Sequence, residues 1–242
     1  MPKNTSGIKA KTAKTAKTAK NDKTPDEMRS DILDAVMCHV PFDGWSEDSI
    51  NKAASEIGLS RAYIKLSFPD GAAGMVDMYL ERIDDEMLEE LAKLPVDEIR
   101  IRDRISTAIK VRMDINARHK EVVSRTVTFL ALPHNAAQSV KSLWRTADHM
   151  WRWAGDKATD YNHYTKRVIL SGVYSTTLLY WLNDTSDDYE DTWAFLDRRI
   201  ENVMQFEKVK SKGLAMLDKI PGLADIFGPK NNASSPDDKT QH

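Results

Sequence analysis

The 242-residue chain has little of what several protein classes require. Ten glycines and nine prolines are too few for the turn-rich sequence of a β-sandwich or barrel, and one cysteine excludes a disulfide framework or a cysteine-based zinc site. No apolar run approaches the roughly 20 residues of a membrane-spanning helix, and the N-terminus lacks the apolar segment of a secretory signal. We therefore expect an all-α intracellular protein.

The motifs of common enzymes are also missing. There is no Gly-x-Ser-x-Gly, no phosphate-binding loop and no dinucleotide fingerprint, and the six histidines lack the spacing of helical zinc or di-iron sites. Asp160 and His163 form a single Asp-x-x-His, in which Asp160 is better interpreted as a helix cap. We expect Cys38, on the apolar side of the first helix, to be buried and inert. The sequence favours a binding protein with no catalytic residues, metal or cofactor.

The net charge of −2 hides an asymmetry. Residues 1–25 carry seven lysines against one acid, Asp22, a local charge of +6, so the remainder carries −8. The repeated Lys-Thr-Ala sequence of 11–20 offers almost no apolar surface, so we expect this tail to be disordered. It is either a solvated tail or a weak electrostatic tether to anionic lipid or nucleic acid. The polar residues 229–242 form a second expected tail.

Between the tails, apolar residues recur at helical spacing. A first helix is expected at about 32–40, ending at Pro41, and Ser46 and Ser60 are suited to cap two short helices that end at Ile57 and Phe68. Further segments with helical periodicity lie at 76–94, 101–109, 119–132, 135–153, 161–183 and 187–208. No stretch shows sustained two-residue alternation, so we predict about nine or ten helices, with one helical domain at 26–208.

The two short helices around Gly58 have the layout of a helix-turn-helix, and a larger helical body follows, as in TetR-type repressors. A DNA-reading helix needs several cations for phosphates. Residues 43–67 instead carry a net charge of −1, from Lys52, Arg61 and Lys65 against Asp43, Glu47, Asp48 and Glu56. We therefore expect the motif to serve as packing; a DNA-binding TetR-type regulator with a small-molecule pocket is the alternative.

Aromatic residues concentrate between 144 and 193, where five of the six tryptophans and five of the seven tyrosines lie. Tyr174 and Trp181 share one helical face, and Trp193 lies early in the next helix beside Asp188 and Asp191. Helices joined by a short loop are antiparallel neighbours, so these side chains could form an aromatic patch with acids, as at protein interfaces. Alternatively, the acids complement a helix N-terminus and the tryptophans are core.

An apolar stripe follows the helical domain within 209–228. Its members are Leu214, Leu217, Ile220, Leu223, Ile226 and Phe227. The stripe is too short to span a bilayer, and Pro221 is expected to kink it. Such a helix packs on the core, packs on a second copy, or lies in the membrane interface with its apolar residues inserted.

Several short motifs recur in the order found in one known family. They are ILDA at 32–35, VP at 40–41, GW at 44–45, ASEIGLS at 54–60, LPHN at 132–135, MW at 150–151, AGD at 154–156, TDYN at 159–162, YTKR at 164–167, Tyr174 with TT at 176–177, and EDTW at 190–193. In these motifs the chain from about residue 30 to 212 resembles the COQ nine family, accessory proteins of coenzyme Q biosynthesis.

The resemblance implies a TetR-like fold that has lost DNA binding, a homodimer, and an apolar pocket for a lipid of isoprenoid character. It also implies a terminal amphipathic helix that reaches the membrane, and a partner, the di-iron hydroxylase that acts on demethoxyubiquinone. The family's partner-binding patch maps onto Tyr174, Asp191 and Trp193, to which we add Trp181 and Asp188 from their positions.

The sequence therefore predicts a non-enzymatic, lipid-binding accessory protein of ubiquinone biosynthesis. It would take an isoprenoid quinone precursor from the membrane and present it to the hydroxylase, without binding nucleic acid. The expected location is the inner membrane surface, on the cytoplasmic side in a bacterium or the matrix side in a mitochondrion.

Overall fold

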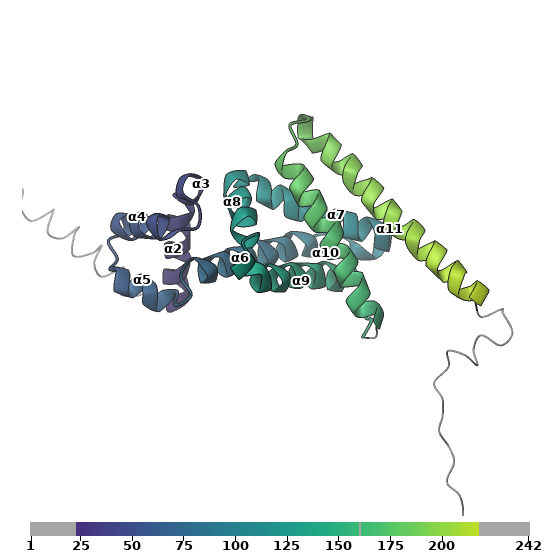
Figure 1. Ribbon diagram of the computed structural model, residues 1–242, viewed down its shortest axis with the longest axis horizontal. Helices are drawn as coiled ribbons and strands as arrows, with labels where there is room; N and C mark the ends of the chain where they lie inside the picture. The colour runs from purple at the N-terminus through teal and green to yellow at the C-terminus, as the bar shows by residue number, and fades with distance from the viewer. Residues whose placement is uncertain (1–22, 160, 218–242) are drawn as a thin grey trace, which may run out of the picture. The chain divides into compact units, whose positions relative to one another are not determined.

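A computed structural model describes residues 23–159 and 161–217, with the backbone alone at 204 and 206–217. These residues form ten α-helices and three short 3-10 turns, and no strand occurs among them (Figure 1). The predicted all-α class and helix number are confirmed. The chain divides into two compact units, and the boundary between them in the sequence falls between Leu196 and Asp197. The tails expected at the two ends lie, apart from 23–25, outside the described residues.

The four N-terminal helices are α2 Pro25–Met37, α3 Val40–Asp43, α4 Glu47–Ile57 and α5 Arg61–Ser67. The predicted caps are confirmed, because the hydroxyls of Ser46 and Ser60 accept hydrogen bonds from the backbone N–H groups three residues ahead. Gly58 ends α4 in the left-handed region, with φ of 64°, where a side chain would be strained. The helix-turn-helix is therefore formed as predicted.

The first helix differs from its predicted range. It begins earlier, at Pro25, and ends at Met37, and Pro41 lies in the first turn of α3 instead of closing α2. Proline is tolerated there because the first N–H groups of a helix have no internal partner. Cys38, expected to be buried, is exposed because it follows the last turn of α2.

The body consists of α6 Ala72–Ala92, α7 Ile101–Ala117, α8 Lys120–Leu130, α9 Ala136–Trp153 and α10 Tyr161–Leu182, with turns η1 Val96–Glu98 and η2 Pro133–Asn135. Helix α6 packs against α7 and α9, and α9 packs against α10 (Figure 1). A four-residue period buries one face of α6, formed by Tyr79, Ile83, Met87 and Leu91.

The N-terminal helices are fastened to this body through α3 and α8. Trp45 Nε1 donates a hydrogen bond to Thr126 Oγ1 at 2.9 Å, and both side chains are buried. Arg125 Nε donates to the carbonyl of Pro41 at 3.1 Å. The Trp45 ring also lies 5.7 Å from the ring of Tyr79, centroid to centroid. The segment from α3 to Trp45, directly before the helix-turn-helix, therefore packs on the body, and Trp45 lies against two side chains of the body's interior.

The last described elements are the turn η3 Asp187–Tyr189 and helix α11 Glu190–Leu217. Helix α11 continues past residue 208, where we expected a boundary, since no proline interrupts it before Leu217. Two of the predicted membrane-facing residues, Leu214 and Leu217, lie in α11, where only the backbone is described. The other four, Ile220, Leu223, Ile226 and Phe227, lie outside the described residues. Within 23–159 and 161–217, no helix is both long and apolar enough to cross a membrane.

Candidate functional site: a cavity and a neighbouring loop

The helices α6 to α10 surround a cavity of about 280 Å³. Each of the five helices contributes to its wall, and most of that wall is apolar. The apolar side chains are Leu80, Val123, Val127, Leu130, Ala131, Leu143, Leu178 and Leu179. A native core is close-packed, with few voids larger than a water molecule, so a cavity of this size is a candidate ligand site.

Part of the cavity wall, which we call its polar end, is polar and buried. Tyr79, Ser142 and Arg112 line it, each at most 4% exposed, together with Tyr174. The hydroxyls of Tyr79 and Ser142 are buried and have no hydrogen-bond partner in the protein. Arg112 Nε donates to Tyr174 Oη at 2.8 Å. Burial raises the pKa of Tyr79 far above its ordinary value, so its phenol remains a protonated donor.

Other lining residues reach the surface. Ala131, at the end of α8, is exposed, and Leu179 on α10 is 50% exposed. The wall of the cavity thus includes exposed apolar residues as well as the buried polar groups around Tyr79 and Ser142. This combination suits an amphiphilic ligand better than a uniformly apolar one.

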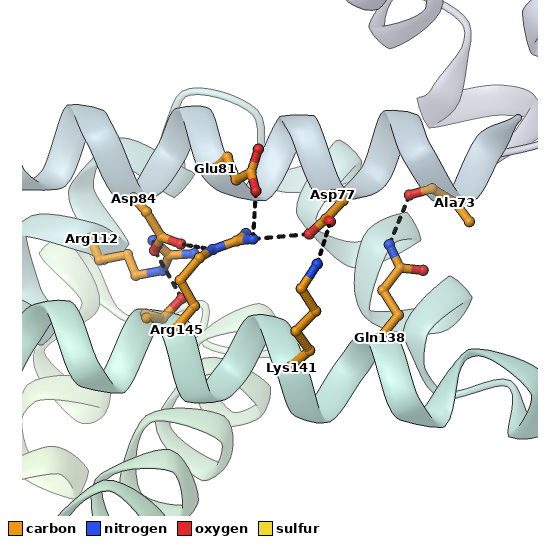
Figure 2. Close-up of polar contacts among 9 residues, drawn as sticks. Ala73, Asp77, Glu81, Asp84, Arg112, Gln138, Lys141 and Arg145 are labelled. Carbon is orange, nitrogen blue, oxygen red and sulfur yellow. Dashed lines mark hydrogen bonds and ion pairs between the residues drawn. The ribbon is translucent and has the colours of Figure 1, made fainter. Parts of the chain in front are cut away.

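A buried ionic network fixes Arg112 at the polar end (Figure 2). Asp84 of α6 is 1% exposed and accepts hydrogen bonds from Arg112, from Thr146 Oγ1 at 2.8 Å and from Arg145 Nε at 3.0 Å. Arg145 also contacts Asp77 and Glu81, at 3.0 and 2.9 Å. The carboxylate of Asp84 thus balances the guanidinium of Arg112 and ties α6 to α7 and α9.

The loop between α10 and α11 follows the C-terminal end of α10, one of the five helices around the cavity. Asp184 accepts hydrogen bonds from the backbone and hydroxyl groups of Ser186 and Thr192, which hold the loop closed. Burial opposes ionisation of Asp184, but these hydrogen bonds outweigh it and set its pKa well below the ordinary value. Asp188 and Tyr189 have φ of 48° and 57°, a left-handed backbone that is strained for a bulky tyrosine.

The structure separates the five residues of the predicted partner patch. Asp188 and Asp191 are exposed, Trp193 is half-buried, and its indole N–H donates to the Asp188 carbonyl at 2.9 Å. Tyr174 and Trp181 are buried, Tyr174 against the cavity and Trp181 with an indole N–H that has no partner. Only three of the five therefore share a surface, and partner binding by the set stays a prediction.

Two residues that the sequence pattern did not single out, Tyr189 within the loop and Lys120 on α8, contact each other here. The Nζ atom of Lys120 lies 4.9 Å from the ring centroid of Trp181 and 4.8 Å from that of Tyr189. Lys120 also donates to the Asp184 carbonyl at 3.2 Å. Tyr189 lies between the patch acids Asp188 and Asp191, but Lys120 comes from α8, and no local pattern could reveal that contact.

The remaining predicted features are explained by local contacts. Among the described residues, no group of three or more histidine, cysteine or acidic side chains could hold a metal. His163 contacts the Ala158 carbonyl at 3.0 Å, and Asp160 lies outside the described residues. In the helix-turn-helix, Arg61 pairs with Glu47 at 2.8 Å and Lys52 with Asp43 at 2.6 Å. These pairs occupy cations that a DNA phosphate would need.

Comparisons with known proteins agree with this architecture. A sequence model of the COQ9 family matches residues 136–207. The chain is 34% identical over 212 residues to the mitochondrial ubiquinone biosynthesis protein COQ9 of Rattus norvegicus, covering 84% of this chain and 68% of that protein. It is 32% identical over 213 residues to the protein of the same name from Homo sapiens, covering 84% and 67%.

A solved structure is similar in fold. The chain matches a TetR transcriptional regulator from Nitrosomonas europaea with a TM-score of 0.60, at 22% identity, over 72% of this chain and 97% of the regulator. The predicted TetR-like fold is thereby confirmed. The chain spans about two thirds of the length of the COQ9 relatives that it matches.

Proposed function

The chain belongs to the COQ9 family of ubiquinone biosynthesis proteins, and from this premise we propose that it is a non-enzymatic accessory protein that binds an isoprenoid quinone precursor and delivers it to demethoxyubiquinone hydroxylase. The observation that carries the proposal is the cavity between α6 and α10, with its apolar wall and surface opening. The apolar surface of a bound lipid gains free energy by leaving water for such a wall.

A binding role without catalysis agrees with the chemistry of the cavity. Its polar groups are hydroxyls and the guanidinium of Arg112, which is paired with Asp84. Hydroxyls without a neighbouring base are weak nucleophiles, and the raised pKa of Tyr79 keeps its phenol from acting as a base near neutral pH. The cavity therefore orients a ligand, and the chemistry takes place on the partner enzyme.

The exposed part of the α10–α11 loop is the proposed docking site for the hydroxylase. Asp188, Asp191 and Trp193 offer two acids and a half-buried aromatic anchor, a combination typical of interfaces. Trp181 supports the loop from inside, with its ring 5.6 Å from that of Tyr189, whereas Tyr174 lies against the cavity. Lys110 Nζ, 5.5 Å from the Trp193 ring centroid, helps to hold the anchor in place.

Membrane contact and self-association complete the proposal. The apolar stripe that begins with Leu214 would lie in the interface of the inner membrane, on the matrix side in a mitochondrion or the cytoplasmic side in a bacterium. A second copy would cover the outer face of α10, where Tyr164 and Val168 are 60% and 61% exposed. Exposed Gly172 lies one turn further on that face and would allow close helix approach.

The lipid-binding step can be tested by narrowing the cavity. Val127→Trp places a large ring on the cavity wall, whereas Thr128→Trp, next to it on α8, adds the same ring on an exposed side chain outside the wall. Native mass spectrometry should detect quinone lipid carried through purification with wild type and Thr128→Trp, and much less with Val127→Trp. Equal lipid on both variants would contradict binding in the cavity.

The delivery step can be tested by docking. Trp193→Lys should weaken binding to purified demethoxyubiquinone hydroxylase by about tenfold or more, the effect of removing an aromatic interface anchor. Phe42→Lys is the matched control, since Phe42 is 82% exposed on α3 and outside the loop. Unchanged hydroxylase binding by folded Trp193→Lys would refute the assignment of this loop.

A further inference from the structure

We propose that the cavity holds the oxygenated ring of the lipid, ring first, with Tyr79, Ser142 and Tyr174 donating hydrogen bonds to ring oxygens and the tail leaving between Ala131 and Leu179. This inference rests on the proposed function, since it specifies which end of the lipid enters the protein. It assigns these three hydroxyls as the residues that recognise the head group.

The size of the cavity supports the ring-first orientation. A cavity of about 280 Å³ is just below the roughly 300–1,000 Å³ of pockets that take drug-sized ligands, so it suits a small group. A six-membered ring with two oxygens and one or two further substituents is such a group. A long isoprenoid tail, with five carbons in every unit, does not fit. The bulk of the tail must therefore lie outside, past the exposed Ala131 and Leu179.

The hydroxyls without a hydrogen-bond partner indicate which atoms of the ligand would lie at the polar end of the cavity. A buried hydroxyl without a partner is costly, and almost all such groups in native proteins are hydrogen-bonded. Tyr79 and Ser142 both lack a protein partner at one end of a single cavity. The Tyr174 hydroxyl already accepts from Arg112 Nε, so its own proton is free to point elsewhere. The polar end thus presents hydroxyl donors, and a ligand there must supply acceptors.

The charge balance favours a neutral acceptor. Arg112 is the cation nearest these hydroxyls along the cavity wall, and Asp84 already pairs with its guanidinium. A carboxylate or phosphate would bring an excess negative charge into this buried end, whereas a quinone carbonyl or a methoxy oxygen accepts without adding charge. An oxygenated neutral ring therefore fits both the donors and the electrostatics.

The test removes the hydroxyls and keeps the shapes. Tyr79→Phe and Ser142→Ala are made singly and together, with Ser175→Ala as the matched control. Ser175 also lines the cavity, but its hydroxyl already donates to the Ser171 carbonyl at 2.7 Å. Two probes share one geranyl tail: a methyl-dimethoxy-1,4-benzoquinone, and geranylbenzene, whose ring has no oxygen. Affinities are measured by titration calorimetry on the full chain.

Wild type and Ser175→Ala should bind the quinone more tightly than geranylbenzene. The double variant should bind the quinone about 10- to 100-fold more weakly, as expected when donors matched to a ligand are removed, and geranylbenzene as well as wild type does or better. Each single variant should show part of the loss, so that misfolding of one leaves the other informative.

The possible failures are distinguishable. If wild type binds neither probe, the proposed lipid-binding function is wrong. If wild type binds both probes equally, or the variants weaken both to the same extent, lipid binding stands and the ring-first orientation is overturned.

Discussion

The substitution Asp84→Asn tests whether the network in Figure 2 holds the body together. The carboxylate of Asp84 accepts from Arg112, Arg145 and Thr146, and it is 1% exposed. An asparagine keeps the size but loses the charge and turns one acceptor into an N–H₂ donor that faces other donors. Arg112, 2% exposed, would then be a buried cation without its counter-ion.

The expected loss is large. Breaking a buried ion pair by removing one partner typically costs about 3–5 kcal/mol. At about 2–4 °C per kcal/mol for a chain of this size, the melting temperature should fall by roughly 6–20 °C. Glu81→Gln is the control, because Glu81 contacts the same Arg145 at 2.9 Å but its side chain is 53% exposed. An exposed pair contributes about 0–1 kcal/mol, so Glu81→Gln should melt within a few degrees of wild type.

The assay is thermal unfolding followed by circular dichroism, with denaturant titration to obtain the free energy of unfolding. The double variant Asp84→Leu with Arg112→Met should recover much of the loss, since apolar replacements of both partners leave no unpaired charge. The reasoning would be refuted if Asp84→Asn were no less stable than Glu81→Gln, or if the double variant were less stable than Asp84→Asn.

Three further outcomes are expected. Because the pKa of Asp184 is lowered in the folded protein, its contribution is complete above about pH 5 and is lost as the pH falls towards its folded pKa; the melting temperature of wild type should fall more steeply between about pH 5 and pH 3 than that of Asp184→Asn. Val168→Glu on the exposed face of α10 should shift the protein towards monomer in analytical ultracentrifugation, and an unchanged dimer would exclude that face. Deleting Ser211 onward should reduce partitioning into anionic vesicles by about tenfold or more in a sedimentation assay, and equal pelleting would remove the membrane role.

Most of the fold could be predicted because its signals are local. The hydroxyls of Ser46 and Ser60, and the period of four on α6, fix helix ends and faces within a few residues of sequence. The predicted end of the first helix was wrong because the local rule for proline allows two structures. Pro41 suits either the end of one helix or the first turn of the next, and only the packing of α3 on α8 decides.

The site was much less predictable because it depends on contacts between distant residues. The sequence placed Tyr174 and Trp181 on one helical face, but that face could be a surface or a core, and it is core. The cavity combines side chains from five helices, and the unpaired state of Tyr79 and Ser142 is a property of their surroundings. Likewise, motif residue Arg167 is buried between Asp148 and Asp156, at 2.6 and 3.1 Å, a structural clamp that the motif alone does not reveal.

The residue directly before the helix-turn-helix, Trp45, contacts two residues that line the cavity. Trp45 follows α3, yet its indole donates to Thr126 and its ring lies against Tyr79, and both of these residues line the cavity. The hydroxyl of Thr126 accepts from Trp45 and donates its one proton to the Val122 carbonyl, so it has no proton left to donate to a ligand. Tyr79, Ser142 and Tyr174 therefore remain the proposed hydroxyl donors to a ligand, and the ring of Tyr79 packs against Trp45, which directly precedes the helix-turn-helix. With Arg61 and Lys52 paired to acids, the N-terminal helices offer few cations to DNA, and Trp45 beside them instead supports the cavity wall at Thr126 and Tyr79.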